Sequence, residues 1–543
     1  MFDNVQSFPG TSATHERSEE WIFFALLALV TLLVMLELLS LYSTPVPDSY
    51  LWWGDESWLL LEFRTQMLTG IFRHPYALGS SLAQGSGMIF GNMWIPALFY
   101  GIPAALVSPV AMDIVLLGRT VTAIFAFTLL VALFEIAQRL TSDRVLAMFS
   151  VLLLVTSRSF LLTSHSARYD ILSALAIIVG VYVLLCYGTK WTRARHAAVV
   201  GFLTCATLLI TIHVTLALAL AAYVTVVYQA RGSRLKSLLA FAGGGAAFVL
   251  LLIGITALRG QPIVGRAWNG SFALNLHDIP ALRIYSRSVQ TANLLQRWGT
   301  LQKFGLGYIL AFAVIVILAV IQFARKAVRW KMGWSVATLL IVFLSWLEFE
   351  SAAPTSYLIY MLPVLALLAA LAMKRLSSEA IRNWIILGLG VVLSVIAIAG
   401  MPGAHGKGYQ LLSSNYQAVG AALDQIEQAD SSSHPLVLAF NPAVHEVLRD
   451  TNVRLMTTHF VEFSMGTLNV DSVLQAEHVN YALVYLSALK PDYMREVGPI
   501  MTVLRKTATP LWERVGYFTD IGRSYFDSRL GAPDTIRLYR LHN

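Results

Sequence analysis

The chain has 543 residues, of which 57% are hydrophobic and only 13% are charged. Soluble proteins average roughly 25% charged residues, so this composition excludes an ordinary soluble protein and indicates a membrane protein with many spans. The formal net charge of +8 is no sign of nucleic-acid binding, because basic residues of membrane proteins gather in their cytoplasmic loops.

The first long apolar run, residues 21–42, follows a mixed acidic and basic stretch and has no small-residue cleavage site. We therefore expect an uncleaved membrane span and not a signal peptide. Further apolar runs are long enough to cross a hydrocarbon core of roughly 30 Å, and they bring the prediction to about eleven transmembrane helices. The predicted spans are 21–42, 111–138, 145–162, 170–187, 197–213, 214–229, 236–257, 304–323, 333–349, 355–373 and 383–400.

The segment 91–107 is apolar but short, and it contains Pro96 and Pro103. These features favour a re-entrant or interfacial helix over a span. If this segment does not cross, every short basic loop falls on one side together with the N-terminus, which the positive-inside rule assigns to the cytoplasm. The outer side then receives the first loop 43–110, the turn at 164–170, the loop 258–303 and everything after residue 401.

The tail changes character at about residue 402. Its apolar runs are short and alternate with amphipathic helical stretches, as in a small α/β domain. We predict strands at 436–440, 481–486 and 535–541 and helices at 415–428 and 470–478. The chain is thus predicted to have two domains, a transmembrane domain at 1–401 and a soluble extracytoplasmic α/β domain at 402–543.

An acidic pair, Asp55 and Glu56, follows the first predicted span and precedes an amphipathic segment. A helix that starts here favours ionised carboxylates through its dipole. One interpretation is a general base that takes a proton from an acceptor hydroxyl. The alternative is a first-turn carboxylate in an exposed loop.

A second polar group lies on the predicted outer side, where the fourth span begins. A charged pair such as Arg168 and Asp170 at a membrane boundary either pairs internally or marks a polar cavity. The alternative is an arginine that extends to the interface and an aspartate that only caps the helix. The neighbouring His165 is a candidate ligand or proton carrier.

The outer loop 258–303 carries an excess of basic residues, against the positive-inside trend. An anionic ligand accounts for this excess, because arginine matches phosphate oxygens in a bidentate manner. Unspecific contact with anionic lipid headgroups is the alternative. The candidate phosphate-binding residues are Arg259, Arg266, Arg283 and Arg287.

The sequence gives little support for a zinc site or a Walker-type phosphate site. The sequence has no zinc signature and no Walker-type phosphate loop, so we predict no metal site and no certain cofactor. The glycine-rich stretch 243–247 lies inside a predicted span and indicates close helix packing.

Taken together, these residues resemble the GT-C glycosyltransferases, in particular the bacterial relatives of the protein O-mannosyltransferases, a group that includes the lipid A aminoarabinose transferases. The order of features matches: one span, an outer loop with the acidic pair, Arg119 early in the next span, and the Arg-x-Asp at 168–170. The run 356–371 is similar to the family's Tyr-rich Leu-Pro helix, and Tyr357 within it is assigned to substrate binding. An extracytoplasmic α/β domain then closes the chain.

The resemblance implies a membrane glycosyltransferase that moves a sugar from a polyprenyl-phosphate donor to an acceptor hydroxyl on the extracytoplasmic side. It assigns the general base to Asp55, with Glu56 as its neighbour. From their place on the predicted outer side we add Glu56 and Asp170 as further catalytic candidates and Arg168 and His165 as substrate-binding candidates. The donor is a substrate and not a cofactor, and no divalent metal is required. The partners are membrane lipids and a glycan, lipid or protein acceptor, without nucleic acid.

The implied location is a bacterial inner membrane, with the N-terminus in the cytoplasm and the C-terminal domain in the periplasm. The alternative function is a transporter or flippase of a lipid-linked or anionic substrate. The sequence leaves the sugar and the acceptor open.

Overall fold

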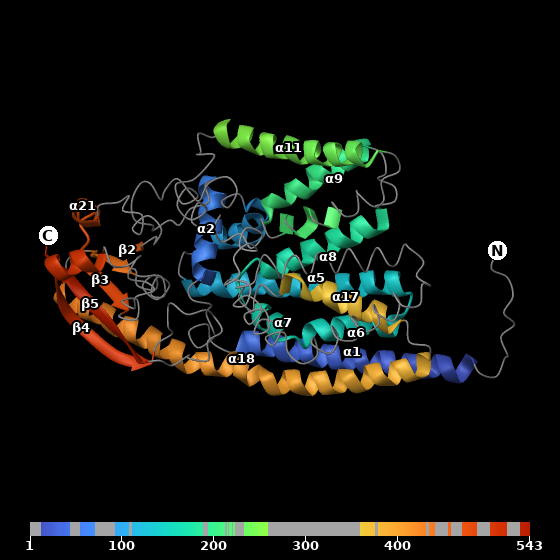
Figure 1. The fold of residues 1–543 in the computed structure, drawn as a ribbon. Coiled ribbons are helices and arrows are strands. Elements are labelled where there is room, and N and C mark those ends of the chain that lie inside the picture. The colour runs from blue at the N-terminus through green and yellow to red at the C-terminus, as the bar shows by residue number, and fades with distance from the viewer. Residues whose placement is uncertain are drawn as a thin grey trace, which may run out of the picture.

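The computed structural model is mostly helical, with a five-stranded sheet at one end of a bundle of apolar helices (Figure 1). It describes residues 12–43, 55–70, 93–107, 111–164, 166–187, 194–211, 214–215, 217–219, 221–222, 233–258, 359–374, 378–430, 434–439, 454–457, 470–485, 500–517 and 533–542.

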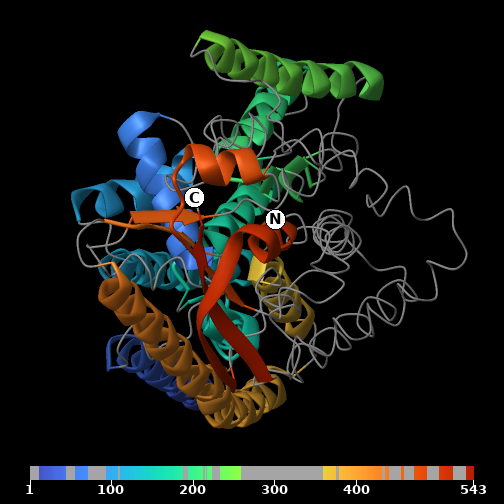
Figure 2. The same ribbon diagram turned by 90° about the vertical axis from the view of Figure 1, so that its left-hand side faces the viewer.

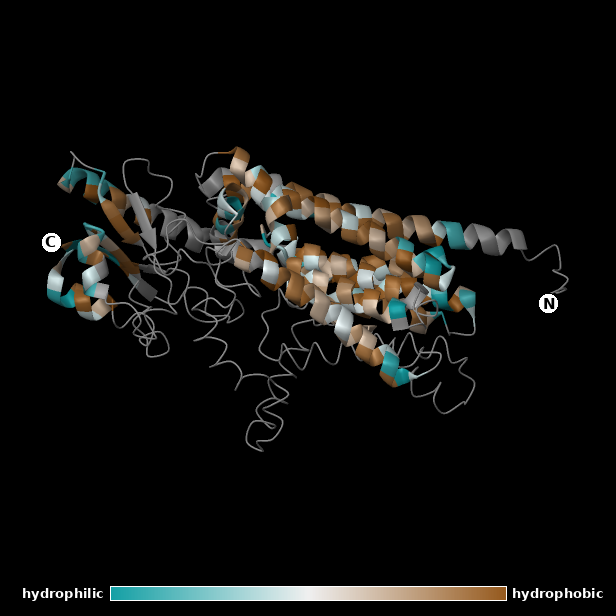
Figure 3. Ribbon diagram, turned by 90° about the horizontal axis from the view of Figure 1, so that it is seen from above, coloured by the Kyte–Doolittle hydropathy of each residue, from teal (hydrophilic) through white to brown (hydrophobic). Residues whose placement is uncertain are grey.

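The bundle is built around two nearly fully buried helices. They are α6 (Arg144–Val155) and α17 (Leu362–Met373), which are apolar on every face, as expected of helices surrounded by others. Around them pack α1 (Ser12–Ser43), α5 (Ala111–Thr141), α8 (Asp170–Tyr187) and α18 (Glu379–Ala429). Figure 3 shows hydrophobic residues along these helices and hydrophilic ones toward the ends of the bundle.

Four described helices are long and apolar enough to cross a membrane: Glu19–Leu39, Ile114–Thr141, Arg234–Ile255 and Glu379–Ala399. They coincide with four of the predicted spans. The predicted span 170–187 is the shorter apolar helix α8, and 355–373 is described from residue 359 and contains α17. Predicted spans 304–323 and 333–349, and most of 214–229, lie outside the described residues.

Two predicted spans are interrupted. The run 145–162 divides into α6 and α7 (Arg158–Thr163), because Thr156 and Ser157 bond to the backbone. Thr156 Oγ1 donates to the Leu152 carbonyl at 2.8 Å, and Ser157 Oγ accepts from the Phe160 amide at 3.2 Å, so these side chains compete with the helix ladder. In the run 197–213, α9 (Ala194–Ala206) tightens into the 3₁₀ turn η5 (Thr207–Leu209).

The segment 93–107 is too short to cross a bilayer. It consists of α3 (Trp94–Pro96), the π-helix η3 (Ala97–Gly101) and α4 (Ile102–Leu106), with 3, 5 and 5 residues. At about 1.5 Å per residue these elements span roughly 20 Å, less than the roughly 30 Å of a hydrocarbon core.

These short elements pack against α2 (Asp55–Thr69), which runs crosswise to the bundle helices at the end nearest the sheet (Figure 1). A Cβ added to Gly101 would lie 2.4 Å from the carbonyl oxygen of Phe63, so only glycine lets the two backbones approach this closely.

Charged side chains hold the opposite end of the bundle together. Asp143 caps α6 through the Val145 and Leu146 amides and accepts from Arg382 Nη2 at 2.5 Å. Lys374 Nζ donates to the Thr141 carbonyl. These residues belong to loops that the sequence assigns to the cytoplasm, and that assignment stays a prediction.

The sheet has the order β2-β1-β3-β5-β4. Its strands are β1 (Leu436–Ala439), β2 (Arg454–Thr457), β3 (Tyr481–Tyr485), β4 (Ala508–Tyr517) and β5 (Pro533–Leu541). β1 is parallel to β2 and β3, whereas β5 is antiparallel to β3 and β4. The predicted strands are β1, β3 and β5, and the sequence analysis missed β2 and β4.

Both faces of the sheet are covered, because alternate residues of its strands point to opposite sides. Val437, Leu483 and Leu538 face the last turns of α18, around Val419 and Ile426. The other face packs against α21 (Val470–Ala476) and the helical residues 500–507 (Figure 2). Helix α18 passes without interruption through the predicted domain boundary at residues 401 and 402 and joins bundle and sheet.

The glycine-rich stretch 243–247 packs as expected. It lies in α11 (Arg234–Leu258), which contacts α9. A Cβ on Gly244 would lie 1.8 Å from the Ala198 carbonyl oxygen, and one on Gly201 would lie 2.0 Å from the Phe241 carbonyl oxygen. The two helices therefore touch backbone to backbone, as small residues permit in membranes.

We predict that Gly244→Ala destabilises the protein by about 1–3 kcal/mol, because the added methyl group must separate the two backbones. The matched control is Gly243→Ala, since a Cβ there meets nothing within 4 Å and alanine gains up to about 1 kcal/mol in helix propensity. Thermal unfolding of the purified protein in detergent measures both. Equal unfolding temperatures for the two variants would contradict the close contact.

Candidate functional site

Helix α2 begins at Asp55, so the acidic pair stands in the first turn of a helix, as the sequence predicts. The positive end of the helix dipole lies there. The side chains of Asp55 and Glu56 lie outside the described part, and the structure fixes only the helix that carries them.

Helix α2 is fixed by contacts one and two turns further on. Leu60, Leu61 and Phe63 are fully buried. The Arg64 Nε donates to the carbonyl of Ala104 at 3.0 Å, and the Phe63 ring stands edge-on to Tyr169 with centroids 6.3 Å apart. The start of α2 is therefore held on a rigid support.

Gly118 of α5 is the point at which two predicted features meet. A Cβ built on it would lie 2.8 Å from the Ala167 Cβ and 2.9 Å from the Leu60 Cδ1. The helix that starts at Asp55 and the turn that precedes Arg168 thus pack on the same glycine. The sequence places these two features more than a hundred residues apart.

An ion pair lies buried next to this contact. Arg168 Nε donates to Asp170 Oδ2 at 2.8 Å, and the two residues are 4% and 1% exposed. Tyr360, at the start of α17, donates its hydroxyl proton to Asp170 Oδ1 at 2.6 Å. Both carboxyl oxygens of Asp170 therefore accept a hydrogen bond. Arg168 and Asp170 pair internally, which is one of the arrangements that the sequence leaves open.

A second tyrosine holds the backbone of the same turn. The Tyr100 hydroxyl, which is fully buried, donates to the Arg168 carbonyl oxygen at 2.9 Å and lies 3.0 Å from Thr122 Oγ1. Burial raises the pKa of Tyr100, so its hydroxyl stays protonated and remains a donor. The segment 93–107 is thereby tied to the ion pair.

Further polar side chains line this region. Arg119, the residue after Gly118, is only 2% exposed. The hydroxyl groups of Ser166 and Ser173 are buried without a hydrogen-bond partner among the described residues. A buried polar cluster of this kind is expensive inside a membrane protein and is typical of a functional site.

The structure brings together some of the predicted site residues. Arg168 and Asp170 form the pair, and Asp55 and Glu56 begin the helix that packs beside it. The other candidates, His165, Arg259, Arg266, Arg283, Arg287 and Tyr357, lie outside the described residues. In the described part no group of three or more His, Cys, Asp or Glu side chains is arranged to hold a metal ion.

The sequence analysis missed Tyr360 and Tyr100. Tyr360 follows Tyr357 by three residues in the Tyr-rich run, which was the available signal. Tyr100 lies in an apolar segment whose prolines mark it as irregular, but nothing in that pattern points to its hydrogen bond.

No family model matches the chain, and no curated protein matches it in sequence. The structure of ArnT from Cupriavidus metallidurans bound to undecaprenyl phosphate is similar to it, with a TM-score of 0.48 and 14% identity over 94% of this chain and 97% of ArnT. The apo structure of the same ArnT has a TM-score of 0.46 and 14% identity over the same shares of both chains. ArnT is a lipid A aminoarabinose transferase with the GT-C fold, a member of the group that this sequence resembles.

Proposed function

We propose that the protein is an integral-membrane glycosyltransferase that moves a sugar from a polyprenyl-phosphate donor to an acceptor hydroxyl on the outer side of a bacterial inner membrane. One observation carries the proposal: the helix that starts at Asp55 and the turn that holds Arg168 pack together on Gly118. This contact supports the assignment of a candidate base and a candidate phosphate-binding arginine to one site.

Asp55 acts as the general base. Its oxygen takes the proton of the acceptor hydroxyl, and the acceptor oxygen attacks the anomeric carbon of the donor sugar. The bond between that carbon and the phosphate oxygen breaks, and polyprenyl phosphate leaves. The attack comes from the face opposite to the leaving group, so the anomeric configuration inverts. Glu56 supports the acceptor beside the base.

Arginine stabilises the negative charge that develops on the phosphate. Arg168 takes this role together with the arginines of the loop 258–303. Asp170 is a positioning residue in this proposal and not a second base, because Arg168 and Tyr360 occupy both of its carboxyl oxygens. The burial of the pair excludes water, which strengthens its interactions.

Asp55→Asn should lower sugar transfer by about 10²- to 10⁴-fold, the usual contribution of a general base. The measurement uses purified full-length protein, polyprenyl-phosphate mannose or polyprenyl-phosphate aminoarabinose as donor, and total envelope lipid as acceptor. The matched control is Glu62→Gln, which removes a carboxylate from the same helix two turns further on. It should retain nearly full activity.

Transfer by Asp55→Asn at the wild-type rate would refute the role of the base. The transporter alternative predicts a different pattern. Under it, neither protein forms product, and the variant loses flux of the same lipid across vesicle membranes.

Asp170→Asn should destabilise the protein by about 3–5 kcal/mol, because it leaves the Arg168 guanidinium buried without its counter-charge. Tyr360→Phe removes one hydrogen bond to the same carboxyl group and should cost about 1.5–3 kcal/mol. Thermal unfolding in detergent measures both.

The positioning role of Asp170 needs a second readout. Tyr360→Phe keeps both charges of the ion pair but removes the hydrogen bond that positions Asp170. The KM for the donor should rise more than kcat falls, because the pair holds the arginine less firmly while the base is intact. If Tyr360→Phe is destabilised but its KM for the donor is unchanged, the ion pair has only a structural role.

A further inference from the structure

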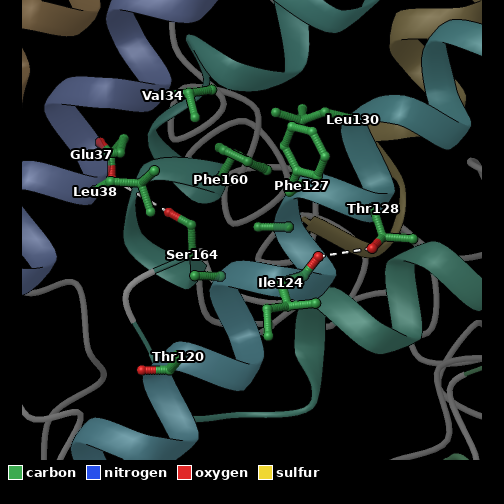
Figure 4. A pocket seen from close by; sticks show the side chains of 12 residues that line it. Val34, Glu37, Leu38, Thr120, Ile124, Phe127, Thr128, Leu130, Phe160 and Ser164 are labelled. Carbon is green, nitrogen blue, oxygen red and sulfur yellow. Dashed lines mark hydrogen bonds between the residues drawn. The ribbon is translucent and has the colours of Figure 1, made fainter.

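A cavity of about 320 Å³, called the groove below, lies between α1, α5 and α7 (Figure 4), and neither Arg168 nor Asp170 lines it. Most of its walls are apolar, and its volume falls at the lower end of the range of roughly 300–1,000 Å³ for small-molecule sites. The lining residues from α1 are Val34, Glu37 and Leu38, those from α5 include Ala123, Ile124 and Phe127, and those from α7 and its C-terminus are Phe160 and Ser164.

The groove opens sideways, on the surface that runs along the helices of the bundle. Ile124 and Phe127 on its wall are 61% and 63% exposed, although both are large apolar side chains. Helix α5 is long and apolar enough to cross a membrane, so this surface faces hydrocarbon when the helix spans. A groove with such walls fits a single hydrocarbon chain that enters sideways from the bilayer.

One end of the groove is polar. Glu37 is 6% exposed, and the Ser164 hydroxyl donates to its Oε2 at 3.5 Å; Figure 4 shows the two side chains turned toward each other. An ionisable residue inside a membrane span is costly and indicates a function. Ser164 precedes Arg168 by four residues, so the two lie at most about 14 Å apart along the chain.

The chemistry of this end indicates which kind of lipid headgroup the groove can bind. No arginine, lysine or histidine is among the described residues that line the groove. A phosphate headgroup therefore finds no cation there, whereas a carboxyl group accepts hydrogen bonds from a hydroxyl or amine. The groove is complementary to an uncharged or cationic headgroup that donates a hydrogen bond.

We propose that the groove between α1 and α5 binds the hydrocarbon chain of a lipid acceptor, and that Glu37 binds the hydroxyl or amine of its headgroup. This inference rests on the proposed function and names the class of its acceptor. The acceptor chain then enters through a route of its own, separate from the arginine-lined region assigned to the donor phosphate.

The test is photolabelling of the full-length protein in lipid nanodiscs with two probes that have the same chain. One is hexadecanol with a diazirine in the chain, and the other is hexadecyl phosphate with the same diazirine. Mass spectrometry of peptides should find hexadecanol in α1 and α5 at several times the level of hexadecyl phosphate. An excess of unlabelled hexadecanol should suppress labelling by the hexadecanol probe. This competition shows that the labelling is specific and needs no variant.

Two pairs of variants complete the test. Ala123→Phe fills the groove and should lower labelling and transfer at least fivefold, whereas Val131→Phe, on the exposed surface of α5 outside the groove, should change neither. Glu37→Gln should abolish the preference for the alcohol over the phosphate. Its control, Glu135→Gln, removes an exposed carboxylate of α5.

Equal labelling by both probes would mean that the groove holds only bulk lipid, and it would overturn the inference. Selective labelling combined with full transfer by Ala123→Phe would overturn the acceptor role. Labelling does not require chemistry, so Asp55→Asn should be labelled like the wild type. A failure of the proposed reaction is thereby distinguished from a failure of the acceptor groove.

Discussion

The buried ion pair between Arg168 and Asp170 constrains the end of the bundle at which α2 lies. Neither charge is tolerated alone in a low-dielectric interior, because each would carry an uncompensated desolvation cost of several kcal/mol. Tyr360 supplies the second hydrogen bond to Asp170, and Tyr100 fixes the Arg168 carbonyl. The starts of α8 and α17 and the segment 93–107 must therefore meet at one point. Helix α2 rests on that assembly through Gly118, so the position of the acidic pair at its start depends on an ion pair elsewhere in the sequence.

The sequence predicts those parts of the fold that a single physical property decides. Apolar runs of sufficient length identify α1, α5, α11 and the first half of α18, and short apolar runs in the tail identify β1, β3 and β5. Where two properties compete, the prediction is wrong or incomplete. The apolar run 145–162 predicts one helix, but the hydroxyl groups of Thr156 and Ser157 bond to the backbone and end it. Strand β4 is mostly exposed and pairs along its length with β5, including a bond from Arg537 Nε to Glu513 Oε2 at 2.9 Å.

The predicted domain boundary at residues 401 and 402 lies inside a continuous helix. The apolar runs become short at about residue 402 and predict the start of a second domain there, yet α18 continues through this position for a total of 51 residues. At about 1.5 Å per residue this helix is roughly 77 Å long, well beyond the roughly 30 Å that a span needs. The far end of α18 buries Val419 and Ile426 under the sheet. This packing stabilises a helix that local propensity alone does not predict. The sheet is consequently held by a stiff helix at the same end of the bundle as α2, and not by a flexible linker.

In the proposed reaction both the donor and the acceptor are lipids, and their hydrocarbon chains are chemically alike. Discrimination between them must therefore come from the headgroups, through attraction at one site and the lack of it at the other. The described residues divide in this way. Arg168 and Arg119 lie buried near the start of α2, whereas the groove between α1 and α5 presents the carboxyl group of Glu37 and no described cation. A phosphate placed in that groove would lose its hydration without gaining a counter-charge. In this proposal the headgroup directs each lipid to a site of its own, and α7 with the turn that follows it connects the two sites.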